Sequence, residues 1–168
     1  MIRGFPAIFT PLGRAILLVG ALALAACREP VRATTPKASV PTVRTIEIRV
    51  DDSMRYSTTL LFAGRGEKLR LVLRNVGKAP LAEMGHNWLL LRRGVDAEEF
   101  VGGAVLAKDT GYVPAERRAD IFATTRMLGA GETDEIVFNA PTEPGRYVYV
   151  CTFPGHYGLG MKGVLTVQ

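Results

Sequence analysis

Short runs of β-favouring residues, separated by turn residues, dominate the chain from Thr42 to its end. In the run at 43–50, apolar residues alternate with Glu47 and Arg49, and the run at 68–75 shows nearly the same alternation. Alternation with a period of two is typical of strands that bury one face and expose the other to water. Eight strands are predicted, at residues 43–50, 58–62, 68–75, 86–91, 121–125, 135–138, 145–150 and 161–167. The pattern predicts an all-β fold, a β-sandwich formed by residues 42–168.

The stretch near residues 96–108 does not follow the strand pattern. Phe100 and Ala104 are four residues apart, as on one face of a helix, and Asp96 is placed to cap the first helical turn. Gly102 and Gly103 oppose helix formation, because together they lower helix propensity by up to about 2 kcal/mol. We therefore expect a short helical flap outside the sandwich.

The first 26 residues have the composition of an export signal, with two arginines, no acid and an apolar stretch at 15–26. A helix of that length would measure about 18 Å, which is too short for a hydrocarbon core of about 30 Å. Residues Leu24 to Cys27 resemble the lipobox of bacterial lipoproteins, which implies a lipoprotein signal peptide at 1–26 and lipidation of Cys27. Residues 27–41, which contain prolines and small polar residues, are expected to form a flexible tether.

The charge pattern argues against nucleic acid as a partner. The formal net charge is +5 at pH 7, and removal of residues 1–26 would lower it to +3, because that segment contains Arg3, Arg14 and no acid. The remaining basic residues are interspersed with acids, as at 65–74, and no run of five like charges occurs. A mixed, solvated surface without a nucleic-acid site is predicted.

Few residues of the predicted sandwich can bind a transition metal through nitrogen or sulfur. The chain contains only two histidines, His86 and His156, and residues 42–168 contain only one cysteine, Cys151. Met161 follows His156 after a short glycine-containing loop. Two imidazoles, one thiolate and a weak thioether are the ligand set of a trigonal copper site. Each residue alone could be an ordinary core residue, but their joint occurrence favours a metal site.

Two other chemistries use the same residue types. Cysteine and two histidines can bind zinc tetrahedrally, but the thioether of Met161 favours copper. A nucleophilic cysteine needs a histidine base and a group that orients it, and no further histidine is present to leave His86 or His156 free for that role. One copper ion, cycling between Cu(I) and Cu(II), is the expected cofactor.

From His86 to Gln168 the chain resembles the azurin family of small blue copper proteins. The resemblance rests on residues 84–88 (Met-Gly-His-Asn-Trp), 151–156 (Cys-Thr-Phe-Pro-Gly-His), 161–163 (Met-Lys-Gly) and the turn at 128–132. It implies an eight-stranded Greek-key sandwich, the cupredoxin fold.

The resemblance also implies roles for individual residues. It implies three equatorial ligands and two weak axial groups at the copper, namely His86, Cys151, His156, Met161 and the backbone carbonyl of Gly85. Asn87 would hold the ligand loop by hydrogen bonds and tune the cysteine sulfur. Trp88 would be a core indole.

Three features depart from the family pattern. Four residues separate His156 from Met161, where azurins have three, so the axial bond length is an open question. The first strands contain no cysteine, so the disulfide typical of azurins, worth about 2 to 4 kcal/mol, cannot form. No third histidine is available as a pH switch, and Glu83 places a carboxylate beside a rim that is apolar in the family.

The resemblance implies an electron carrier and not an enzyme. We expect a lipid-anchored protein, on the periplasmic side of a bacterial membrane or on the cell surface, that exchanges electrons with redox proteins such as cytochromes or copper enzymes. Apolar residues near His156 are expected to form a docking patch: Met84, Phe153, Pro154, Tyr157 and Leu159. The alternatives are a copper-trafficking or copper-storage lipoprotein, and a fragment of a copper oxidase or nitrite reductase, which would need additional histidines.

Overall fold

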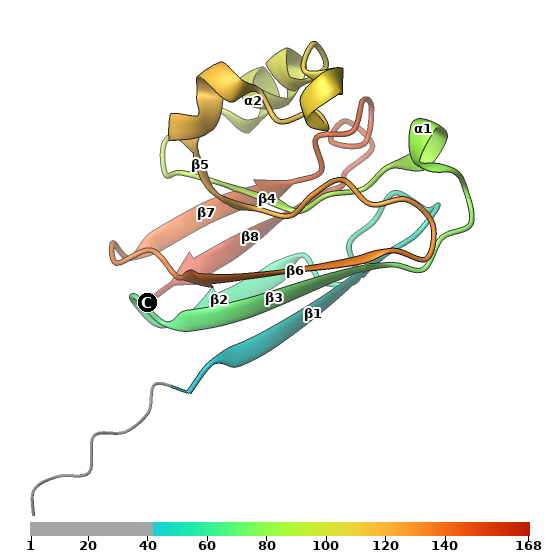
Figure 1. The fold of residues 1–168 in the computed structure, drawn as a ribbon. Coiled ribbons are helices and arrows are strands. Elements are labelled where there is room, and N and C mark those ends of the chain that lie inside the picture. Colours follow the sequence, from blue (N-terminus) through green and yellow to red (C-terminus); the bar gives the residue numbers. More distant parts are fainter. Residues whose placement is uncertain (1–41) are drawn as a thin grey trace, which may run out of the picture. The chain divides into compact units, whose positions relative to one another are not determined.

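In the computed structural model, which describes residues 42–168, the chain forms two facing β-sheets (Figure 1). The alternating apolar residues of the sequence are buried in this sandwich. In β1 (Arg44–Val50) and β3 (Lys68–Asn75), every second side chain is buried and most of the others face solvent. The predicted signal peptide, Cys27 and the tether lie outside the described residues. Within 42–168, no helix combines the length and apolar character needed to cross a membrane.

The eight strands found within residues 42–168 form a three-stranded and a five-stranded sheet. The first has the order β1-β3-β6 and the second the order β2-β8-β7-β4-β5. The remaining strands are β2 (Leu60–Ala63), β4 (Leu89–Leu91), β5 (Ile121–Thr124), β6 (Thr133–Asn139), β7 (Gly145–Val150) and β8 (Lys162–Val167). The pairs β1–β3 and β2–β8 are parallel and all others are antiparallel. Because β1, β2 and β3 alternate between the sheets, the chain crosses the sandwich twice at its start, and the predicted all-β sandwich is confirmed.

The core between the sheets is apolar and rich in aromatic rings. Leu71 and Leu73 of β3 are fully buried, as are Trp88 and Tyr149 from the five-stranded sheet side. The rings of Trp88 and Tyr149 lie 5.5 Å apart between centroids, a separation typical of favourable aromatic pairs. Trp88 is therefore a core indole, two residues from His86.

Some boundaries differ from the sequence prediction. The strand predicted at 86–91 begins only at Leu89, because His86 pairs with Leu128 in an isolated bridge and the amide of Trp88 donates to the Thr125 hydroxyl instead of to a strand. A one-turn helix, α1 (Leu81–Met84), precedes this segment and was not predicted. Pro80 stands before it, with a fixed φ that suits a helix start.

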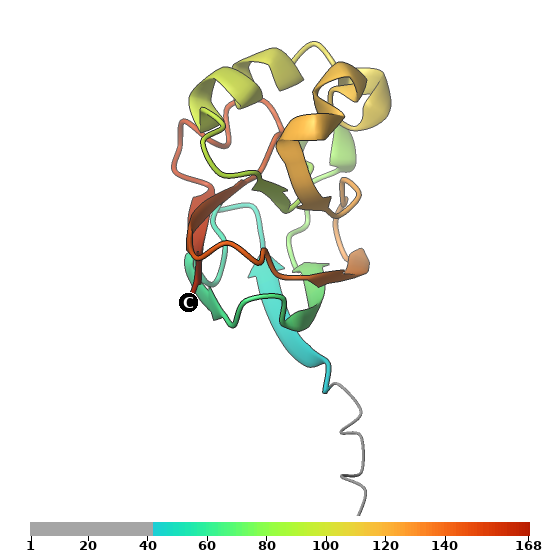
Figure 2. The same cartoon turned by 90° about the vertical axis from the view of Figure 1, so that its left-hand side faces the viewer.

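The predicted flap contains α2 (Ala97–Ala104), whose first turn is capped by Asp96 through bonds from the amides of Glu98 and Glu99 at 2.9 and 3.0 Å. Gly102 and Gly103 face open space, so they cost helix propensity but no packing. Two short 3₁₀ helices follow that were not predicted, η1 (Lys108–Thr110) and η2 (Ala115–Asp120). These helices gather on the outer side of the five-stranded sheet, away from β1 and β3 (Figure 2).

A second apolar cluster forms beneath the flap. Phe100 and Val101 of α2 pack with Leu89 and Leu91 of β4 and with Val150 of β7. β4 is therefore buried on both faces, and all three of its residues are apolar. The outer cluster fixes the positions of β4 and β7, the two strands whose ends lead to the predicted metal ligands.

Candidate metal centre

Strand pairing brings the predicted ligands to one end of the sandwich. β4 and β7 are antiparallel, with Leu89 opposite Val150, so the start of β4 lies beside the end of β7. His86 precedes β4 by three residues and Cys151 directly follows β7. His156 and Met161 lie in the loop that connects β7 to β8. Residues far apart in sequence therefore meet because of sheet register.

Three potential ligand atoms converge at this end. One atom each from His86, Cys151 and His156 lie within 4.8 Å of one another, and all three residues are buried. The Cys151 sulfur is 3.5 Å from Nδ1 of His156. The two imidazole rings lie 4.9 Å apart between centroids. A single metal ion could be bound by all three side chains.

The hydrogen-bonding state of His86 supports a metal. Both ring nitrogens are buried and neither has a hydrogen-bond partner among the described residues. A buried polar atom without a partner costs about 1 to 3 kcal/mol, so such atoms in a folded protein call for a ligand or a bound species. A metal ion held by His86 supplies that missing partner.

Burial also fixes the charges of the ligands. Removal from water lowers the pKa of His86, and the carboxylates of Asp52 and Asp51 oppose this only in part. Removal from water, with a smaller contribution from His86, lowers the pKa of His156 to about 4. Both imidazoles are therefore neutral at pH 7, with lone pairs free to bind a metal.

The cysteine shows the opposite shift for the same reason. Burial raises the pKa of the Cys151 thiol to about 12, and the backbone N–H groups of Asn87 and Phe153 partly counter this. A thiol in such a site loses its proton when a metal cation binds the sulfur. Neutral nitrogens and a soft sulfur in a dry site fit copper, which accepts both donor types.

Asn87 connects the two ligand-bearing segments. Its Nδ2 donates to the Thr152 hydroxyl at 2.8 Å, and its Oδ1 accepts from the Thr152 amide at 2.9 Å. Its carbonyl accepts from the Tyr56 hydroxyl at 2.6 Å. Thr152 and Tyr56 were not singled out in the sequence, and for Tyr56 no local signal existed, because the contact joins residues 31 positions apart. The pair Asn87–Thr152 fixes the neighbours of His86 and Cys151 to each other.

The loop from His156 to Met161 is closed by its own backbone. The Met161 amide donates to the His156 carbonyl at 2.9 Å, and the Met161 carbonyl accepts from the Cys151 amide at 3.2 Å. Gly160 has a φ of +96°, which a residue with a side chain rarely adopts. The extra loop residue is thus accommodated by a glycine, and Met161 remains fully buried.

On the other side of the site, the carbonyl oxygen of Gly85 lies 3.9 Å from the Cys151 sulfur. A side chain at Gly85 would come within 2.9 Å of the Phe153 ring, so a glycine allows the backbone to approach this closely.

The residues of the predicted docking patch differ in exposure. Leu159 is 52% exposed, Met84 and Pro154 are half-buried, and Phe153 is buried, with its ring centroid 4.7 Å from that of His156. Tyr157 packs against the cluster beneath α2, and Nζ of Lys162 lies 4.3 Å from its ring centroid. Near Phe153, an apolar groove of about 340 Å³ is lined by Leu81, Ala82, Lys108, Gly111, Tyr112 and Met127.

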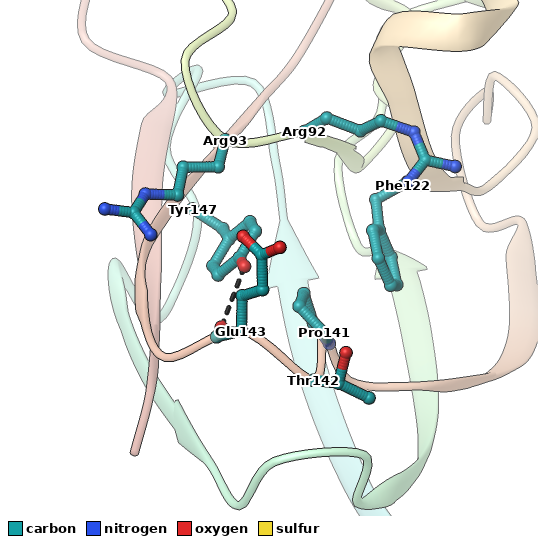
Figure 3. A pocket seen from close by; sticks show the side chains of 7 residues that line it. All are labelled: Arg92, Arg93, Phe122, Pro141, Thr142, Glu143 and Tyr147. Carbon is teal, nitrogen blue, oxygen red and sulfur yellow. Dashed lines mark hydrogen bonds between the residues drawn. The ribbon is translucent and has the colours of Figure 1, made fainter.

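A different kind of pocket lies at the far end of the five-stranded sheet, where β4 ends and β7 begins (Figure 3). Its volume is about 280 Å³, and it is lined by Arg92, Arg93, Phe122, Pro141, Thr142, Glu143 and Tyr147. Figure 3 shows the two arginine side chains diverging on either side of Glu143. The lining contains no histidine, cysteine or methionine, so this pocket is unsuited to a copper ion.

Comparison with known proteins agrees with the geometry. Residues 44–168 match the model of a family described as copper binding proteins, plastocyanin/azurin family. Auracyanin-B from Chloroflexus aurantiacus is 37% identical over 126 residues, covering 74% of this chain and 52% of that protein. Azurin from Pseudomonas aeruginosa is 32% identical over 127 residues, covering 73% of this chain and 84% of that protein. The matched part of the chain thus spans about half of auracyanin-B and most of azurin.

Solved structures show the same likeness. The crystal structure of dithionite-reduced auracyanin from Roseiflexus castenholzii has a TM-score of 0.66 and 36% identity, covering 74% of this chain and 96% of that chain. Auracyanin A from Chloroflexus aurantiacus, described as a "blue" copper protein, has a TM-score of 0.67 and 31% identity, covering 76% of this chain and 100% of that chain. With a copper site formed by His86, Cys151 and His156, the chain belongs to the plastocyanin/azurin family of copper-binding proteins and is an azurin-like cupredoxin rather than an enzyme.

Proposed function

We propose that this protein carries single electrons between redox partners. The observation that carries the proposal is the convergence of His86, Cys151 and His156 in a buried site where both nitrogens of His86 have no hydrogen-bond partner within residues 42–168. Copper, when bound, supplies the one-electron change between Cu(I) and Cu(II). The protein's contribution is to hold the ligands in one arrangement, so that little rearrangement accompanies the change.

The hydrogen bonds around the site support this role. The Asn87–Thr152 pair and the backbone bonds of Met161 tie all the ligand segments to one another. Rigid ligands suit electron transfer, because neither oxidation state requires the chain to move. A copper-trafficking or copper-storage protein needs ligands that open to release the metal, which this network disfavours.

Met161 is proposed as the axial ligand and the Gly85 carbonyl as the weak group opposite. Met161 is buried, and its backbone is fixed to both His156 and Cys151. The Gly85 carbonyl already lies near the sulfur. A thioether favours Cu(I) more than an oxygen donor does, so Met161 would raise the reduction potential.

The proposed docking patch consists of Met84, Phe153, Pro154, Tyr157 and Leu159. The Phe153 ring lies against the ring of His156, and Tyr157 packs against the cluster beneath α2. Redox complexes form and dissociate quickly, and small apolar contacts suit such transient interfaces. Partners of this kind would be cytochromes or copper enzymes.

The proposed location is the periplasmic side of a bacterial membrane or the cell surface, with Cys27 as a lipid anchor. The sequence from Leu24 to Cys27 supports this, and the tether at 27–41 would let the copper domain reach its partners. Mass spectrometry of the mature N-terminus tests it. An acylated Cys27 is expected, and an unmodified Cys27 on soluble wild-type protein would contradict the anchor.

Electron self-exchange between Cu(I) and Cu(II) forms of the protein tests the function. Leu159→Lys should slow exchange roughly tenfold while the copper spectrum stays unchanged, because like charges then face each other across the contact. Val137→Lys is the matched control, since Val137 is similarly exposed at 54% but lies on β6. Equal exchange in both variants, or loss of copper to a chelator as fast as electron exchange, would contradict electron transfer through this face.

A further inference from the structure

The loop between β1 and β2 contacts both ligand-bearing segments through two adjacent residues. Tyr56, which is buried, donates its hydroxyl to the carbonyl of Asn87, next to His86. Arg55, which is exposed, donates from Nη1 to the carbonyl of Leu159, in the loop between His156 and Met161, and to its neighbour Met54 at 3.1 Å. Two adjacent residues therefore connect the segment around His86 with the loop between His156 and Met161.

We infer that Arg55 is a positioning residue, which holds the loop before Met161 in place and raises the reduction potential through its positive charge. The effect on the reduction potential rests on the proposed electron-transfer function, whereas the positioning of the loop does not. Arg55 does not contact the ligand atoms, so it would act through the backbone of Leu159 and Gly160.

The loop has particular need of such a contact. Four residues separate His156 from Met161, and Gly158 and Gly160 among them have the widest backbone freedom. The Leu159 amide is bonded to the Gly155 carbonyl at 3.1 Å, and the Leu159 carbonyl is bonded by Arg55. Without Arg55, that carbonyl would lose its side-chain partner, and the turn before Met161 would be held only by its own backbone bonds.

Arginine suits this position better than lysine does. The site of an added Cβ at Gly160 lies 3.4 to 3.8 Å from Nη1, Cζ and Nη2 of Arg55, so the planar guanidinium lies against the glycine backbone. Lysine carries a compact ammonium group and would not cover this surface in the same way. Lys162, which directly follows the loop, lies over the Tyr157 ring. Two cations thus contact this loop.

The charge of Arg55 is free to act on the site. Within residues 42–168, Arg55 takes part in no ion pair. A nearby cation favours the reduced copper site, whose net charge is lower by one. Asp51 and Asp52, on the same loop as Arg55, place negative charge near His86, and this negative charge raises the pKa of His86 against the larger effect of burial, which lowers it. Because Arg55 is exposed, salt screens its charge and its effect on the potential is modest.

The first test measures hydrogen exchange of the Met161 amide in metal-free protein. Arg55→Gln should exchange about tenfold faster than wild type, the change expected for loss of one charge-assisted hydrogen bond. Arg55→Lys should lie between the two. Arg65→Gln is the matched control, because the exposed Arg65 also donates to a loop carbonyl, that of Thr142 at 3.1 Å. Wild-type exchange in Arg55→Gln would overturn the positioning role.

The second test uses copper-loaded protein and measures the midpoint potential and the electron-spin-resonance spectrum. Arg55→Gln should lower the ratio of reduced to oxidised protein about threefold at fixed ambient potential, equivalent to about 28 mV, and should change the spectrum. Arg55→Lys should retain most of the potential, and high salt should shrink the shift. Equal potentials in wild type and Arg55→Gln would overturn the charge effect. Failure of wild-type protein to bind copper would refute the proposed function, whereas the hydrogen-exchange test on metal-free protein would still decide whether Arg55 positions the loop.

Discussion

The two ends of the five-stranded sheet differ in how their polar side chains are placed, although the same strands, β4 and β7, lead to both. Where β7 leads into Cys151, polar side chains are buried, the imidazoles are neutral, and both nitrogens of His86 lack a partner in the described part of the chain. Where β7 begins, Arg93 and Glu143 remain exposed, and the Tyr147 hydroxyl donates to the Glu143 carbonyl at 2.8 Å. At the far end, polar groups are thus exposed at the surface or bonded to nearby backbone.

The difference shows where a β-sandwich can carry chemistry. Burying imidazoles and a thiol without a counter-ion costs stability, so it requires a surrounding network and a metal that offsets the cost. The network at the copper end consists of Asn87, Thr152 and Tyr56. Variants at this end should therefore change copper binding and stability, and matched variants at the far end should change neither by much.

The largest difference is expected for Cys151→Ala. Cys151 is the only cysteine among residues 42–168 and so the only source of a thiolate ligand, and its removal should abolish the intense blue absorption of the copper-loaded protein. Arg93→Gln at the far pocket should leave the colour intact. Visible absorption at equal copper loading checks both variants. Wild-type colour in Cys151→Ala would contradict the assignment of the copper site to this end of the sheet.

Acid should destabilise the metal-free protein through the copper end. The pKa of His156 is about 4 in the folded state and 6.5 ordinarily, so between these values the unfolded chain binds a proton that the folded chain does not. The free energy of unfolding should therefore be highest above pH 6.5 and fall by about 3 kcal/mol as the pH decreases to 4. Urea unfolding across this range measures it. His156→Gln should remove most of the slope, and an unchanged slope would contradict the assignment.

Asn87→Ala should come next in size. It removes two buried hydrogen bonds and leaves the Thr152 amide and hydroxyl without partners. We expect a loss of about 2 to 3 kcal/mol in the free energy of unfolding, and faster loss of copper to a chelator. Denaturation and chelator kinetics test both. Wild-type values in the two measurements would mean that Asn87 does not hold the ligand segments together.

The smallest change in the free energy of unfolding is expected when the hydroxyl of one tyrosine at either end is removed. Tyr56→Phe removes a buried hydroxyl that donates to Asn87, and Tyr147→Phe removes a partly buried hydroxyl that donates to Glu143. Losses of about 1 to 2 and about 0.5 to 1 kcal/mol are expected, because the first leaves a buried carbonyl without its donor. Only Tyr56→Phe should alter the copper spectrum. A spectral change of the same size in Tyr147→Phe would remove the distinction between the ends.

The sequence predicted the sandwich and the copper ion because both leave local patterns. The alternation at 43–50 and 68–75 indicates strands with one buried face. Three potential metal ligands, Cys151, His156 and Met161, lie within eleven residues of one another. The network that holds the ligands left no such pattern. Arg55 and Tyr56 are separated from their partners by 104 and 31 residues, and only the packing of the sheets brings them together. Likewise α1 and the two 3₁₀ helices are too short to show a period.

Titration of the wild-type protein with Cu(II), followed by visible absorption and electron-spin-resonance spectroscopy, tests the central claim most directly. Binding of one copper ion through the Cys151 sulfur and the imidazoles of His86 and His156 should give an intense blue colour that saturates at one equivalent and disappears on reduction. A pale complex, or saturation at a different stoichiometry, would contradict a buried copper site formed by these three residues.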